Sequence, residues 1–241
     1  MNISKKLPEL IKDYLIENNL LKQNGFFLEA GAFDGVTQSN TVFLEKFGWK
    51  GVLVEPSVNN YKKCLINRPN CISVNLALVS FKNYKKSKFV KGDFNNKEMS
   101  SINAKRTKTA RREKYKRLNK TYTLPLTYFL DYFNQKKNYE NNIEVASLPL
   151  SYLLKQLSIN ELDLLILDVE GFEYSVLKGI NFQIHKPKVI VVEIYKSQYK
   201  KITKLLSKNG YKSPVNLTNF SEEKNPNWDG KHNDYIFTLN N

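Results

Sequence analysis

Short apolar runs alternate with segments of helical periodicity along this chain. Four runs are apolar almost throughout and end close to a charged residue, glycine or proline, which is typical of strands buried on both faces. These runs cover residues 26–30, 52–55, 162–169 and 188–194. A further strand is predicted over residues 72–79, and residues 211–217 and 234–239 are expected to form the last two strands.

Apolar residues three or four positions apart predict helices between these strands. The helical segments cover residues 7–21, 39–47, 57–67, 150–157, 171–179 and 195–206. Alternation of buried strands with helices indicates an α/β fold, a mostly parallel sheet covered by helices on both faces. Such sheets bind ligands at the carboxyl ends of their strands. We expect residues 1–241 to form one domain, since a chain of 241 residues is an ordinary length for it.

The net charge of +15 is concentrated in one part of this basic protein. Residues 81–121 contain fifteen Lys and Arg but only three acidic residues, and the rest of the chain is close to neutral. We expect a basic insertion over about residues 82–147. Such a segment suits an anionic partner, such as nucleic acid, phosphate or a membrane surface. A solvated loop would have the same composition.

Several classes of protein are disfavoured by the sequence. No stretch approaches the roughly 20 apolar residues of a transmembrane helix, and the N-terminus lacks the apolar core of a signal peptide. The two cysteines, Cys64 and Cys71, are seven positions apart, which is neither a metal-binding nor a redox spacing. We therefore expect free thiols in a soluble protein of the cytoplasm, a reducing compartment.

Two predicted strands end in residues that suit a nucleoside. The first runs into a turn, Glu29-Ala30-Gly31-Ala32-Phe33-Asp34-Gly35, whose glycines permit close approach of a ligand. It lacks the glycine fingerprint of dinucleotide-binding loops, and its acids suit a ligand with an ammonium group and a cationic centre. The second strand ends at Glu55, where a carboxylate can accept both hydroxyls of a ribose.

Several blocks of the chain resemble the FkbM-type methyltransferase family. They are Glu29–Val36, Ser39–Glu45, Gly48–Pro56, Leu164–Glu173, Val176–Gly179 and Pro187–Glu193. The resemblance covers residues 25–80 and 148–194 but not the basic segment. It implies a class I methyltransferase, or Rossmann-like, sheet of seven strands. It also implies S-adenosylmethionine as methyl donor, S-adenosylhomocysteine as product, and O-methylation of a sugar, glycan or other small hydroxylated metabolite.

Carried over by position, the resemblance assigns residues to each part of the donor. The methionine end would be lined by Glu29, Gly31, Ala32, Asp34 and Gly35, and its carboxylate bound by Ser39, Asn40 and Thr41. Glu55 would hold the ribose with Pro56 and Ser57 beside it, and the turn near Ala77 would lie by the adenine.

Three carboxylates, Asp168, Glu170 and Glu193, are expected where the methyl group emerges. Methyl transfer is an in-line displacement that depends on positioning, and an acceptor hydroxyl also needs a general base. We expect Asp168 to be that base, with Glu193 and Glu170 as alternatives. The same three groups could hold a divalent cation, but we favour a site without metal.

Other functions remain open at this point. The same fold could methylate the 2′-hydroxyl of RNA, with residues 82–120 following the phosphates, although aromatic residues for base stacking are few there. A non-catalytic binding module is disfavoured because Gly31, Asp34, Glu55 and Asp168 are all present. A dehydrogenase is disfavoured by the missing dinucleotide fingerprint.

Overall fold

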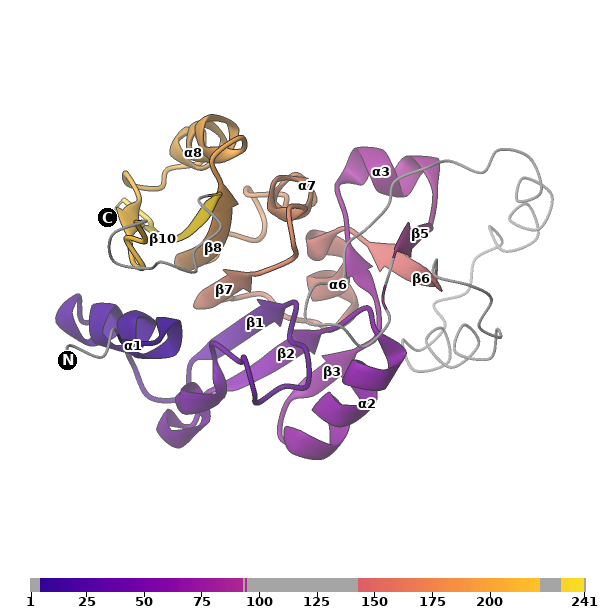
Figure 1. Ribbon diagram of the computed structural model, residues 1–241, viewed down its shortest axis with the longest axis horizontal. Coiled ribbons are helices and arrows are strands. Elements are labelled where there is room, and N and C mark those ends of the chain that lie inside the picture. Colours follow the sequence, from indigo (N-terminus) through magenta and orange to yellow (C-terminus); the bar gives the residue numbers. More distant parts are fainter. Residues whose placement is uncertain (1–4, 93, 95–142, 222–230, 241) are drawn as a thin grey trace.

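The computed structural model describes residues 5–92, 94, 143–221 and 231–240 (Figure 1). None of the helices in these ranges is long and apolar enough to cross a bilayer.

A sheet of seven strands lies at the centre of the molecule. From one edge to the other its strands are β3 (Ile72–Val74), β2 (Lys50–Val54), β1 (Phe26–Ala30), β7 (Leu164–Leu167), β8 (Val189–Tyr195), β10 (His232–Thr238) and β9 (Val215–Asn216). The first five are parallel, and β10 is antiparallel to both of its neighbours. The predicted fold class, a mostly parallel seven-stranded sheet, is confirmed.

Helices cover both faces of this sheet (Figure 1). One face carries α1 (Leu7–Glu17), the 3-10 helix η1 (Val42–Phe47) and α2 (Val58–Asn67), and the other carries α6 (Leu150–Gln156), α7 (Glu173–Leu177) and α8 (Tyr199–Lys208). Each face has its own apolar core. Ile11, Leu44 and Cys64 belong to the first core, whereas Leu153, Val176 and Ile202 belong to the second.

A small second sheet adjoins the large one. The predicted strand 72–79 is split, because the chain leaves the large sheet at Asn75, whose side-chain amide donates to the carbonyls of Glu55 and Pro56 at 2.8 and 2.9 Å. It continues as β4 (Ala77–Leu78), which pairs in parallel with β6 (Ile143–Leu148). On its other side β6 pairs antiparallel with β5 (Phe89–Gly92), and α3 (Phe81–Lys86) joins β4 to β5.

The segment expected as a basic insertion is thus described only at its two ends. Residues 82–92 and 143–147 belong to α3 and the small sheet, while residues 93 and 95–142 lie outside the described residues. The expected helix over residues 39–47 is also shorter than predicted. Only Val42–Phe47 is helical, because residues 39–41 are held by the side chain of Glu29.

Gly31 lets β1 and β7 approach each other at their carboxyl ends. Its φ of +84° lies in the left-handed region, and a Cβ at this position would lie 1.7 Å from the carbonyl oxygen of Asp168. No side chain fits in that space. The turn after β1 and the end of β7 are therefore brought together at the place where the sheet predicts a ligand.

We expect Gly31→Ala to lower the free energy of unfolding by about 3 kcal/mol or more, because it combines left-handed strain with a backbone collision. Gly171→Ala is the matched control. Gly171 has a φ of +90°, but the nearest atom to its Cβ position is Gln198 Nε2 at 3.8 Å, an ordinary contact, so strain alone should cost about 1–2 kcal/mol. Urea denaturation followed by circular dichroism measures both. Equal losses would contradict the collision.

Candidate active site

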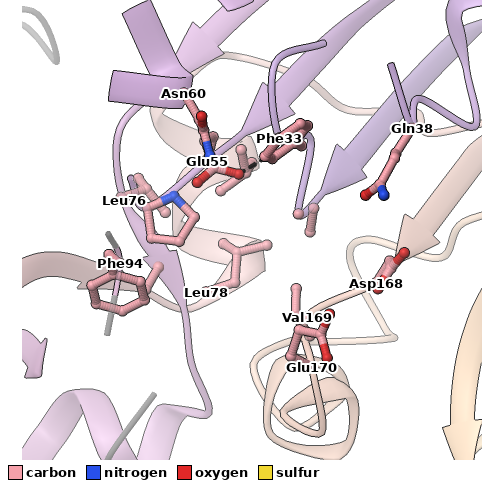
Figure 2. Close-up of a pocket in the computed structure, with 15 residues that line it drawn as sticks. Phe33, Gln38, Glu55, Asn60, Leu76, Leu78, Phe94, Asp168, Val169 and Glu170 are labelled. Carbon is pink, nitrogen blue, oxygen red and sulfur yellow. Dashed lines mark hydrogen bonds between the residues drawn. The ribbon is translucent and has the colours of Figure 1, made fainter. Parts of the chain in front are cut away.

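The carboxyl ends of β1, β2 and β7 open into a pocket (Figure 2). Of the residues predicted from the sequence, Gly31, Glu55, Pro56, Ala77, Asp168 and Glu170 line it. Ala30, Phe33 and Val169, which belong to strand ends singled out from the sequence, line it too, and the lining residues that the sequence analysis missed are Gln38, Val54, Asn60, Leu76, Leu78 and Phe94. The ligand position expected for a mostly parallel sheet is thus the position of the pocket.

Glu55 places a buried carboxylate in the pocket wall. Its Oε2 accepts a hydrogen bond from the backbone N–H of Phe33 at 3.0 Å, and its Oε1 accepts one from Ser57 at 2.7 Å. Burial raises the pKa of this carboxyl to about 7. Each oxygen keeps a lone pair that can accept a hydrogen bond from a ligand hydroxyl. The arrangement therefore suits a pair of neighbouring hydroxyls.

One end of the pocket is apolar. Figure 2 shows Leu76, Leu78 and Phe94 on the side of Glu55, whereas Gln38 and Asp168 lie on the opposite side. Leu78 belongs to β4 of the small sheet, Leu76 lies just before β4, and Phe94 follows β5. A flat aromatic ring beside the sugar would be buried against these side chains. No periodicity in the sequence pointed to Phe94, because it lies within the basic segment.

The three residues predicted to bind the carboxylate of the donor contact the side chain of Glu29 instead. The side chain of Glu29, only 2% exposed, accepts hydrogen bonds from Ser39 Oγ at 2.9 Å, Asn40 N at 2.7 Å and Thr41 Oγ1 at 2.6 Å. None of these four residues lines the pocket. Because the two hydroxyls are turned to Glu29, they hold the loop after β1 in place rather than facing a ligand, which corrects the sequence-based role.

Arg68 completes this buried network and was not singled out from the sequence. Its guanidinium donates to the carbonyl of Gly35 at 2.8 Å, to Ser39 Oγ at 3.1 Å and to Thr41 Oγ1 at 3.3 Å, and it forms an ion pair with Glu45. In the sequence it is one basic residue in a polar turn after a helix, a pattern that predicts a solvated side chain. The loop over residues 31–41 is therefore anchored to both β1 and the end of α2.

The other predicted residues of this loop shape it from within. Asp34 accepts hydrogen bonds from the N–H groups of Val36 and Thr37 at 2.9 and 2.7 Å, and Ala32 is buried in the core below the sheet. Ser57 is the N-cap of α2. Gln38 is the polar side chain of the loop that lines the pocket instead.

Carboxylates form a row across the sheet beside the pocket. Glu193 of β8 is paired in register with Asp234 of β10, and Asp168 follows the residue of β7 that pairs with Val192. Burial, together with neighbouring carboxylates, raises the pKa of both Asp168 and Glu193. Asp168 lines the pocket and Glu193 does not. Asp234 was not predicted as a site residue, although it lay in a predicted strand.

Two further acids belong to the turn after β7. Glu170 lines the pocket, has a φ of 52° and accepts a hydrogen bond from the hydroxyl of Tyr195 at 3.3 Å. Glu173 is fully buried and accepts the backbone N–H groups of Val169 and Gly171 at 3.2 and 2.9 Å. Within the described residues, no three His, Cys, Asp or Glu side chains are grouped so that they could hold a metal ion.

These acids make stability depend on pH. Burial raises the pKa of Glu55 and Glu173 from 4.5 to about 7, so the folded protein binds protons that the unfolded chain releases. Stability should therefore fall as the pH rises from about 4.5 through 7. We expect the Tm of ligand-free protein to be higher at pH 5.5 than at pH 8. Glu193→Gln should raise the Tm at pH 8, whereas Glu161→Gln, at an exposed site, should not. A Tm that increases toward pH 8 would contradict this.

Comparison with known proteins agrees with this geometry. The family model described as the methyltransferase FkbM domain matches residues 29–213. That range includes the end of β1, the loop over residues 31–41, Glu55, Asp168 after β7, and Glu193 of β8. No curated protein sequence matches the chain.

Solved structures similar to this chain are distant in sequence. A TehB-like SAM-dependent methyltransferase from Corynebacterium glutamicum is 9% identical, with a TM-score of 0.44 over 97% of this chain and 87% of that one. Precorrin-6y C5,15-methyltransferase from Geobacter metallireducens is 10% identical, with a TM-score of 0.43 over 95% and 87%. The methyltransferase domain of bacterial CtHen1 is 9% identical, with a TM-score of 0.45 over 98% of each chain.

The family match extends over most of the chain and contains the pocket and its carboxylates. The order and direction of the strands are those of the fold that the resemblance implied. The chain therefore belongs to the FkbM methyltransferase family and is an S-adenosylmethionine-dependent methyltransferase.

Proposed function

We propose that this protein transfers the methyl group of S-adenosylmethionine to a hydroxyl oxygen of a sugar, a glycan or another small metabolite. The observation that carries the proposal is a single pocket with a buried carboxylate, Glu55, at one end and a second carboxylate, Asp168, at the other. Glu55 suits the hydroxyls of the donor's ribose, and Asp168 suits removal of the proton from the acceptor hydroxyl.

The lining residues fit the nucleoside part of the donor. Glu55 accepts the ribose hydroxyls, because both of its oxygens are held in place by backbone N–H groups. Leu76, Leu78 and Phe94 pack against the adenine. Ala77 and Pro56 line the same part of the pocket.

The methionine end of the donor lies toward Gly31 and Gln38. Gly31 leaves room for the ligand because it has no side chain, and Gln38 offers both a donor and an acceptor. The loop that carries Gln38 is held in place outside the pocket by the hydrogen bonds of Ser39, Asn40 and Thr41 to Glu29.

Asp168 is the group that we assign as general base. When bound, S-adenosylmethionine supplies a methyl group on a positively charged sulfur. The acceptor oxygen forms a bond to the methyl carbon as the carbon–sulfur bond breaks, the sulfur keeps the electron pair, and the acceptor proton passes to Asp168. Burial raises the pKa of Asp168, and so do the neighbouring carboxylates of Asp234 and Glu170. Turnover should therefore rise as the pH increases and the base becomes ionised.

RNA is a second candidate acceptor, which one observation favours. Lysines 82, 85, 86, 88 and 91 belong to α3, β5 and the turn between them, and residues 81–92 contain no acid. The ammonium of Lys88 lies 3.2 Å from the ring centroid of Tyr84, which packs edge-on against Tyr152. A basic surface with aromatic rings next to Phe94 of the pocket would suit a ribose 2′-hydroxyl of RNA.

The two cysteines support a reducing compartment, which we propose to be the cytoplasm. Cys64 and Cys71 are both free thiols, and burial raises the pKa of each to about 12, so neither is reactive.

Donor binding tests the first part of the proposal. We expect wild-type protein to bind S-adenosylhomocysteine and Glu55→Gln to bind it at least about tenfold more weakly, because hydrogen bonds to a charged carboxylate are lost. Isothermal titration calorimetry measures both, with Glu161→Gln as an exposed control. If the wild-type protein does not bind S-adenosylhomocysteine, the proposal is wrong.

Methyl transfer to an acceptor tests the second part of the proposal, the role of Asp168 as general base. We expect Asp168→Asn to lower kcat about 10²- to 10⁴-fold while its affinity for S-adenosylhomocysteine stays close to that of the wild type. Mass spectrometry would detect methylation in a panel of sugars and small hydroxylated metabolites, and of RNA separately. Methylation of RNA alone, with binding that weakens steeply as salt is raised, would favour the second candidate. Unchanged kcat in Asp168→Asn would exclude Asp168 as base.

A further inference from the structure

The side chain of Asn60 is buried in the pocket wall without a hydrogen bond. Asn60 lies in the first turn of α2, is 1% exposed and lines the pocket. Its Oδ1 has no partner, and its side-chain amide makes no hydrogen bond to any residue that the structure describes. Its backbone N–H, by contrast, faces the N-cap hydroxyl of Ser57 at 3.5 Å.

An unpaired amide in such a place is costly. Burying a polar group without a hydrogen bond costs about 1–3 kcal/mol, and an apolar side chain of similar size would avoid that cost. The neighbouring Asn59 is exposed to solvent and needs no such explanation. The side-chain N–H groups of Asn60 donate to none of the residues that the structure describes, and they therefore point to a ligand oxygen that accepts a hydrogen bond from them.

Glu55 has no hydrogen-bond donor when it is ionised, whereas a side-chain amide has one. Its carboxylate only accepts hydrogen bonds when it is ionised, whereas each ribose hydroxyl both donates and accepts. When both hydroxyls donate to Glu55, their oxygens still need a donor in a wall that is otherwise largely apolar. Figure 2 shows Asn60 next to Glu55 on the same side of the pocket, away from Gln38 and Asp168.

The local backbone fixes these two side chains relative to each other. Ser57 donates its N–H to Glu55 and caps the helix that carries Asn60. The distance between the carboxylate and the amide is therefore set by a single short segment, residues 55–60. This preorganisation lets the pair bind two atoms of one small group without a change in the backbone.

We propose that Asn60 donates a hydrogen bond from its side-chain amide to a hydroxyl oxygen of the donor's ribose. It thereby acts with Glu55 as a second determinant of nucleoside specificity. The inference rests on the proposed donor site, and it adds a residue of α2 to the groups that the sequence indicated.

The test compares two neighbouring asparagines of the same helix. Asn60→Leu removes the amide but keeps much of its volume, and Asn59→Leu is the exposed control. We expect Asn60→Leu to bind S-adenosylhomocysteine about tenfold more weakly than wild type in calorimetry, because one hydrogen bond is lost. With the 2′-deoxy or the 3′-deoxy analogue, whichever lacks the contacted hydroxyl, Asn60→Leu and wild type should bind equally. Asn59→Leu should match wild type throughout.

Thermal unfolding of the ligand-free protein gives an independent readout. Asn60→Leu should leave the Tm unchanged or raise it, because it removes a buried polar group that has no partner. A clearly lower Tm would indicate a structural role and overturn the inference.

Two other results would also overturn it. The first is that Asn60→Leu binds S-adenosylhomocysteine as tightly as wild type does. The second is that Asn60→Leu loses the same affinity for S-adenosylhomocysteine as for both deoxy analogues. In each case the wild-type protein still binds, so the proposed function stands. Absence of binding by the wild-type protein would instead overturn the proposed function together with this inference.

Discussion

The buried side chains of Glu29 and Arg68, which carry opposite charges, share the hydroxyls of Ser39 and Thr41 near the carboxyl end of β1. An isolated buried charge costs several kcal/mol, and this cost is offset only when partners and hydrogen bonds surround it. The network meets that condition because the loop over residues 31–41 folds back over the end of β1. The position of the loop, and with it that of Gly31 and Gln38, follows from this compensation. Removing the guanidinium of Arg68 would leave the carboxylate of Glu29 buried without an opposite charge.

A second constraint closes the pocket from the other direction. The close approach of Gly31 to the carbonyl of Asp168 joins β1 to β7, and the N–H of Phe33 joins the same loop to Glu55 of β2. The groups that would hold the nucleoside and the group that would take the proton are thus connected through one short loop. Such a site is organised before any ligand arrives, so little ordering remains to oppose binding. Catalysis by displacement depends on this kind of positioning.

Local pattern predicted the strands of the large sheet, the class of that sheet and the place of the pocket, because buried strands are apolar and their ends carry the polar groups. Glu55 and Asp168 could be located in this way. Phe94 and Leu78 could not, because they reach the pocket through a small sheet whose pairing joins residues 77–78 to residues 147–148. Arg68 was missed because a buried guanidinium and a solvated one look alike in a sequence. For the same reason Ser39 and Thr41 were predicted to bind a ligand, although their hydroxyls contact Glu29.

The small sheet also bears on how this enzyme could diversify. Gly92 at the end of β5 is paired with Ile143 at the start of β6, so the chain departs from and returns to neighbouring positions. The cost of closing a loop between fixed ends grows only slowly with its length. The chain between Phe94 and Ile143 can therefore change in length during evolution while β5 and β6 stay in register. The described residues that line the pocket, Phe94 included, lie outside that stretch, so the donor side of the pocket would be inherited unchanged.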